Sequence, residues 1–116
     1  MTGVVQEQRM TYRHSLALET EVHCNGSSVQ AMFRCRTQNI GIGGVFLPAS
    51  ELPLEPSVDV ELVFHLSSNQ AREFRMRAQV VRTTEEGAGL RFPALDRESQ
   101  RQFRLFLMEA KVAARH

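Results

Sequence analysis

Hydrophobic and polar residues alternate along most of the chain before Pro93, which is the pattern of strands that bury one face. The first alternating segment runs from Leu16 to Cys24. After the turn residues Asn25 and Gly26, the alternation resumes at Val29 and continues to Cys35. An Asn-Gly pair between two such segments is typical of a hairpin turn. We therefore expect a β-hairpin over residues 16–35.

Four more strands are expected after this hairpin. A short one at residues 45–47 ends before Pro48, because proline cannot donate a ladder hydrogen bond. The clearest alternation is at residues 58–66, with Val58, Val60, Leu62, Phe64 and Leu66 on one face and Asp59, Glu61, Val63 and His65 on the other. The fifth strand buries Phe74, Met76, Ala78 and Val80 and exposes Arg75, Arg77 and Gln79, and the sixth contains Ala88, Leu90 and Phe92.

The hydrophobic period changes after Pro93. Asp96 is suited to cap a helix, and Phe103, Phe106, Leu107 and Ala110 fall on one helical face. Six short strands joined by tight turns favour antiparallel pairing, and closure into a barrel would hide the edge strands. We therefore predict an all-β fold with a C-terminal helix. The expected parts are a flexible arm at residues 1–13, a β-barrel at 14–93, and a helix and tail at 94–116.

Length and composition limit the possible functions. At 116 residues the chain can form one domain with a core of its own, and contents of 42% hydrophobic and 23% charged residues are ordinary for a soluble protein. The net charge of +1 argues against nucleic acid or a membrane surface as the partner, since both usually require a basic excess. No apolar stretch approaches the roughly 20 residues of a membrane span, so we expect a cytoplasmic location.

Side chains suited to catalysis, metal binding or redox chemistry show no recognisable pattern. The four histidines lack metal-ligand spacing, and there is no nucleophile-elbow or phosphate-loop motif. Symmetric pairing about the first hairpin turn would place Cys24 opposite Val29 and Cys35 opposite Leu18, so we expect two small buried thiols and no disulfide. We predict no enzyme, no catalytic residues, no metal site and no cofactor.

The outward arginines on the second and fifth predicted strands allow one alternative. Arg34, Arg36, Arg75 and Arg77 would form a basic stripe on the sheet, where RNA could bind. Single-stranded nucleic acids also need aromatic side chains on which bases stack, and the outward positions hold Gln30, Met32 and Gln79 instead. A solvated surface is therefore the favoured interpretation.

Two separate segments together suggest a site for an anionic purine ligand. Arg9 and Arg13 offer planar, permanently charged groups that match phosphates or the O6/N7 edge of guanine. The second segment is the turn Asn39-Ile40-Gly41-Ile42-Gly43-Gly44. Its glycines allow a ligand to approach the backbone closely, and the amide of Asn39 can both donate to and accept from a base.

With these two segments the sequence resembles the PilZ domain family, bacterial receptors for cyclic di-GMP. The family motif is Arg-x-x-x-Arg before the first strand and Asp/Asn-x-Ser-x-x-Gly after the second. Arg9, Arg13, Asn39 and Gly44 match it, whereas Gly41 stands where the motif has serine. The resemblance covers residues 8–110 and includes segments 80–82 and 89–92 as closing strands. It implies a six-stranded antiparallel β-barrel of PilZ type.

The resemblance also implies a ligand and roles for the motif residues. Cyclic di-GMP would be bound with Arg9 and Arg13 at guanine edges and phosphate and with Asn39 at a guanine. The glycines of the turn, Gly41, Gly43 and Gly44, belong to the same predicted site. Gly43 and Gly44 would hold the turn open to the ligand.

Two functions follow as hypotheses. The first is a single-domain receptor and adaptor for cyclic di-GMP, which orders its N-terminal arm on binding and signals through an unidentified protein partner. The alternative is a degenerate PilZ-like interaction module with weak or no nucleotide binding. Gly41 favours the alternative, because it lacks a hydroxyl worth about 0.5–1.5 kcal/mol, or about 1.5–3 if the hydroxyl met a charged group. Such a loss weakens binding without abolishing it.

Overall fold

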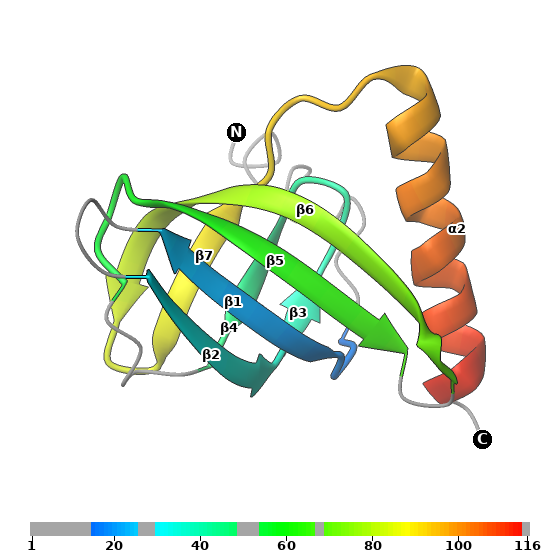
Figure 1. Ribbon diagram of the computed structural model, residues 1–116, viewed down its shortest axis with the longest axis horizontal. Coiled ribbons are helices and arrows are strands. Elements are labelled where there is room, and N and C mark those ends of the chain that lie inside the picture. The colour runs from blue at the N-terminus through cyan, green and yellow to red at the C-terminus, as the bar shows by residue number, and fades with distance from the viewer. Residues whose placement is uncertain (1–14, 26–29, 49–53, 67–68, 115–116) are drawn as a thin grey trace, which may run out of the picture.

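The computed structural model describes residues 15–25, 30–48, 54–66 and 69–114. They form one antiparallel sheet followed by a helix (Figure 1). The strands are β1 (Glu19–Asn25), β2 (Gln30–Arg36), β3 (Asn39–Ile40), β4 (Gly44–Leu47), β5 (Asp59–Leu66), β6 (Asn69–Thr84) and β7 (Gly87–Arg91). The helix is α2 (Arg97–Ala114). The predicted N-terminal arm lies outside the described residues.

The sheet curls so that its two ends form two layers. In Figure 1, β1, β2 and β5 lie in front, β3, β4 and β7 lie behind, and β6 arches between them. The 16 residues of β6 make this possible, because its first half pairs with β5 and its second half pairs with β7. The register shifts between Val80 and Arg82, where a bulge increases the bend of the strand.

The prediction of a six-stranded closed barrel was wrong in strand number and in closure. The strand order is β2-β1-β5-β6-β7-β4-β3, so within the described residues the sheet has seven strands and two edges. The extra strand is β3, a two-residue segment that pairs with β4. Only Thr37 and Gln38 separate β2 from β3 along the chain. These two residues connect the two edge strands, which lie at opposite ends of the strand order and do not pair with each other.

The core lies between the two layers and beneath α2. Phe103 of the helix is fully buried and contacts three core rings, with centroid separations of 6.3 Å to Phe64, 5.1 Å to Phe74 and 5.4 Å to Phe92. The predicted apolar face of the helix is confirmed, since Phe106, Leu107 and Ala110 are buried as well. α2 stands beside the ends of β5 and β6, where this face covers the core (Figure 1).

The predicted helix cap is also confirmed. The backbone N–H of Ser99 donates to Oδ1 of Asp96 over 2.7 Å. This hydrogen bond, together with one to the Ser99 side chain, lowers the pKa of the exposed Asp96 carboxyl from its ordinary value. Asp96 therefore satisfies one of the free N–H groups at the start of α2 and complements the helix dipole.

Some orientations differ from the prediction. Val63 was expected on the exposed outward face, but only 1% of its surface is exposed. Its side chain lies between those of Glu21 and Arg75 on the two neighbouring strands. Val58, expected in the core, precedes β5 and is 36% exposed.

The cysteine pairing in the first hairpin is shifted by two residues from symmetric pairing. Cys24 lies opposite Ala31, and Cys35 lies opposite Thr20. The turn itself, residues 26–29, lies outside the described residues. Both thiols are free, as predicted, but they are half-buried and not fully buried as expected. Burial and the nearby Glu19 raise the pKa of the Cys35 thiol to about 11, so it remains protonated at neutral pH.

Candidate functional site

The turn between β3 and β4 holds the described part of the predicted site. Asn39 pairs with Phe46, and Ile40 pairs with Val45. Across the turn, the N–H of Gly41 donates to the carbonyl of Gly44 over 2.9 Å. Asn39, Gly41, Gly43 and Gly44 are therefore brought together, as the motif predicts.

The glycines of this turn have different steric surroundings. A Cβ atom on Gly44 would lie 2.4 Å from the carbonyl oxygen of Leu90, so the close approach of β4 to β7 requires glycine there. A Cβ on Gly43 would meet nothing within 4 Å. Among the glycines in the described part of the chain, only Gly87 has a positive φ, of 152°. No positive φ therefore requires glycine at positions 41, 43 and 44, and Gly44 is required only because of its contact with Leu90.

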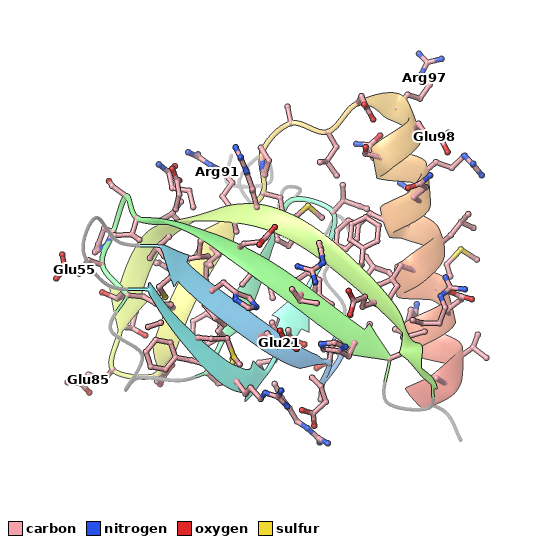
Figure 2. All side chains as sticks on the ribbon, viewed as in Figure 1. Glu21, Glu55, Glu85, Arg91, Arg97 and Glu98 are labelled. Atoms are coloured by element: carbon pink, nitrogen blue, oxygen red, sulfur yellow. The ribbon has the colours of Figure 1, made fainter. Side chains whose placement is uncertain are left out.

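The turn is fixed to the end of β7. The N–H of Phe92 donates to the carbonyl of Gly43 over 3.0 Å, and Gly44 pairs with Arg91. A hollow of about 240 Å³ lies beside this junction, lined by Phe92 together with Asp59, Arg77, Gln79 and Arg91. Arg91 projects from the end of β7 that leads to α2 (Figure 2), and its guanidinium donates to Oε1 of Gln79 over 3.2 Å.

Asn39 begins a row of outward-facing residues that crosses four strands. Strand pairing places Phe46 next to Asn39, then Gly89 next to Phe46, and Arg82 next to Gly89. Gly89 has no side chain, and the Arg82 side chain lies over it. A Cβ atom on Gly89 would lie 3.3 Å from Nε of Arg82. Within the described residues, neither Arg82 nor Arg91 forms an ion pair. The surface beside the turn thus carries Arg82 and Arg91, and the hollow there is lined by one acidic residue, Asp59, as well as by arginines.

Sequence reasoning did not include Arg82, Arg91 or Phe46 in the site. The signal for Arg91 is present in the sequence, since alternation in Gly89-Leu90-Arg91-Phe92 directs its side chain outward. Arg82 is harder to find. The bulge after Val80 changes the alternation, so the side on which residue 82 points depends on the register with β7.

The turn is also tied to the segment that follows the arginine motif. The N–H of Thr37 donates to the carbonyl of Leu18 over 3.1 Å, and the N–H of Leu18 donates to the Thr37 hydroxyl over 3.0 Å. That hydroxyl donates in turn to the carbonyl of Leu16. Arg9 and Arg13 lie outside the described residues. The first described segment after them is therefore attached two residues before Asn39.

The described residues offer few other groups for chemistry. They contain no cluster of three or more His, Cys, Asp or Glu side chains able to hold a metal ion. No helix among them is long and apolar enough to cross a membrane. The arrangement at the turn is suited to binding an anionic ligand with hydrogen-bonding edges.

The family model for the PilZ domain matches residues 7–109, which is most of the chain. The chain belongs to the PilZ domain family. PilZ domains are binding and adaptor modules, generally receptors for cyclic di-GMP, and are not enzymes.

Two solved structures share the PilZ fold with this chain. The PilZ domain of CeSA from a cellulose-synthesising bacterium superposes with a TM-score of 0.66 at 18% identity, covering 85% of this chain and 99% of that one. The Bacillus subtilis inhibitor of motility superposes with a TM-score of 0.64 at 17% identity, covering 90% of this chain. This chain spans 51% of the length of that protein. No curated protein sequence matches the chain.

Proposed function

We propose that this PilZ domain binds cyclic di-GMP at the turn between β3 and β4, with Arg9 and Arg13 closing over the ligand. The observation that carries the proposal is the position of this turn. Its motif residue Gly44 pairs with Arg91, and Arg82 lies on the same face two strands away, on β6; within the described residues neither arginine forms an ion pair. Cyclic di-GMP has two phosphates and two guanines, for which arginine is a suited partner at both groups.

The outward surface at Gly44 supports a planar ligand at this place. Gly44 bears no side chain and lies next to Arg91, while the neighbouring Gly89 is buried beneath the Arg82 side chain. Phe46 is half-buried and offers part of an aromatic surface against which a base can pack. The hollow beside Arg91 adds a place where a guanine edge meets Arg77 and Arg91, whereas Asp59 in the same lining disfavours a phosphate there.

The way in which binding becomes a signal is part of the same proposal. With no catalytic group at the turn, the output is mechanical, and nucleotide draws residues 9–13 against it. The Thr37 hydrogen bonds keep Leu16 and Leu18 in place, so Arg13 has a short tether from which to reach Asn39. The altered surface is then presented to a protein partner. A cytoplasmic location remains a prediction.

A second function is favoured by Gly41. Gly41 lacks the hydroxyl that the motif has at this position. In this second function the domain keeps its fold, but its affinity for nucleotide is low. It would then act through protein contacts alone. Gly41 has no positive φ, so the turn does not require a glycine there for backbone reasons.

Calorimetric titration with cyclic di-GMP, with cyclic di-AMP as the matched control, separates the two functions. Both ligands carry the same phosphates, but only guanine offers the O6/N7 acceptor pair to arginine. We expect saturable binding of cyclic di-GMP and binding of cyclic di-AMP that is at least tenfold weaker. An absence of heat with both ligands at millimolar concentration would support the interaction module instead.

A further inference from the structure

The outward face of α2 carries an apolar stripe that the core does not use. Leu105, Met108 and Val112 are 47%, 61% and 58% exposed, although the opposite face of the helix is buried. They are three and four residues apart, so they form one continuous line along the helix. Single exposed apolar residues are common, but a line of three on one helix is a typical contact surface.

The stripe borders a groove that widens this surface. A hollow of about 790 Å³ lies between α2 and the end of the β5–β6 hairpin, and the three stripe residues line it together with Leu66, Arg72 and Glu109. Arg72 donates to Oε1 of Glu109 over 2.5 Å, which holds the Glu109 carboxylate on this side of the helix. The face therefore combines an apolar line with a fixed acidic group on one flank.

One flank of the stripe carries basic residues, and the other carries a glutamine and a glutamate. In heptad notation, Leu105 and Val112 take position a and Met108 takes position d. The preceding g positions are then all basic, being Arg97, Arg104 and Lys111. The e positions are Gln102 and Glu109. Positions e and g of paired helices form the contacts that select partner and orientation.

We propose that α2 pairs with α2 of a second copy of this chain, in parallel orientation about a two-fold axis. In a parallel pair, each g residue faces the e residue five positions later in the other helix. Arg104 then faces Glu109 of the second copy, and symmetry produces this contact twice. In an antiparallel pair g faces g, which would set Arg104 and Lys111 against basic residues. Only the parallel arrangement makes the flanks complementary.

The apolar seam is short, so the dimer is weak. The seam positions before Leu105 are polar, with Glu98 at a and Arg101 at d, and these two side chains are bound to each other over 2.9 Å within the same chain. Three apolar side chains per helix bury less than the about 1,200 Å² of a typical stable interface. The proposed dimer forms at high protein concentration and does not depend on nucleotide binding, so its failure would leave the proposed function untouched.

Sedimentation velocity of the full chain from roughly 10 µM to 1 mM tests the pairing, a range suited to weak association. The average mass is expected to rise from the monomer value of 13.2 kDa towards twice that value. Met108→Glu should abolish the rise. Met32→Glu is the matched control, because Met32 is also exposed, at 45%, but lies on β2. A chain that stays monomeric throughout, or a Met108→Glu variant that associates normally, would overturn the proposal.

The charged flanks test the orientation separately. Arg104→Glu should weaken the dimer severalfold, because each new carboxylate would face Glu109 of the other copy. Adding Glu109→Arg and Arg72→Glu to Arg104→Glu should restore association, since the charges across the pair are then exchanged and the contact between residues 72 and 109 is kept. Stronger association of Arg104→Glu alone would contradict the parallel pair, because that change relieves repulsion only when g faces g. Thermal melts of each variant confirm that the fold is retained.

Discussion

Thr37 and Leu18 exchange two hydrogen bonds, with the Thr37 N–H bound to the Leu18 carbonyl and the Leu18 N–H bound to the Thr37 hydroxyl. The same hydroxyl donates to the carbonyl of Leu16. Thr37 is buried, with 3% of its surface exposed. It joins the segment after Arg13 to the segment before Asn39, and therefore sets the spacing between the two halves of the proposed site.

Thr37→Val should destabilise the fold by about 1–3 kcal/mol, because it leaves the buried N–H of Leu18 and the carbonyl of Leu16 without their partner. It should also weaken cyclic di-GMP binding under conditions where the variant is folded. Urea unfolding and calorimetry measure the two effects. Thr37→Ser keeps the hydroxyl and serves as control. Equal losses in the serine variant would show that the methyl group, and not the hydrogen bonds, is what matters.

Gly44→Ala and Gly43→Ala should differ in stability, although they are adjacent. The first places a Cβ 2.4 Å from the Leu90 carbonyl, so β4 and β7 must separate, at a cost of about 1–3 kcal/mol. The second meets no atom within 4 Å and should be nearly neutral. Thermal melting compares them. Similar melting temperatures would contradict the close approach of β4 to β7.

Gly41→Ser should strengthen cyclic di-GMP binding by about two- to tenfold, the value of one hydrogen bond of about 0.5–1.5 kcal/mol. The backbone at residue 41 has no positive φ, so a side chain introduces no backbone strain there. Melting temperature and titration are measured together. Weaker binding at unchanged stability would mean that the absent hydroxyl does not limit affinity.

Arg13→Ala should weaken cyclic di-GMP binding at least tenfold, because a charge-assisted contact to phosphate or guanine is lost. Arg97→Ala is the control, since Arg97 has the same spacing to Arg101 but lies on α2. Trypsin cleavage at Arg9 and Arg13 should also slow in the presence of nucleotide. Unchanged affinity in Arg13→Ala would remove this residue from the site.

Stability should depend on pH through Glu21, which accepts hydrogen bonds from Nε2 of His23 and of His65, each over 2.9 Å. These bonds lower the pKa of the Glu21 carboxyl below its ordinary value of 4.5. The unfolded chain therefore takes up this proton first as the pH falls. The stabilisation is complete above pH 4.5 and is lost as the pH falls through the lowered folded pKa.

Glu21→Gln tests this dependence. The variant should lose about 1 kcal/mol at pH 7, and its stability should fall less steeply than that of the wild type under acid. Glu61→Gln is the control, because it removes a carboxylate from the same face without removing these hydrogen bonds. Parallel pH profiles for wild type and Glu21→Gln would contradict the assigned role.

The elements that alternate strictly could be predicted from the sequence, and those set by long-range pairing could not. The helix with its Asp96 cap and the inward residues of β6 follow from local pattern alone. The two-residue strand β3 has no pattern of its own and exists because β4 lies beside it. Whether the edge strands β2 and β3 meet likewise depends on how the whole sheet curls, which no local pattern encodes.

The candidate site shows the same division. The motif located Asn39 and Gly44, and the structure places both at one turn. Arg82 reaches this surface only because β6 has a bulge and pairs with β7 at Gly89. The role of Thr37 depends on a contact with Leu18, 19 residues away in sequence. Such partners are set by the folded arrangement and leave no local trace.

Nucleotide binding at the turn is tested by titrating the isotope-labelled protein with cyclic di-GMP and following the amide chemical shifts. The proposal predicts saturable shifts at Asn39, Gly43 and Gly44, at Arg91, and at residues 9–13. The outward strand face around Glu21, which is labelled in Figure 2 on β1, should change little. Saturable shifts confined to that face or to α2, or no shifts at all at millimolar nucleotide, would contradict the proposed site.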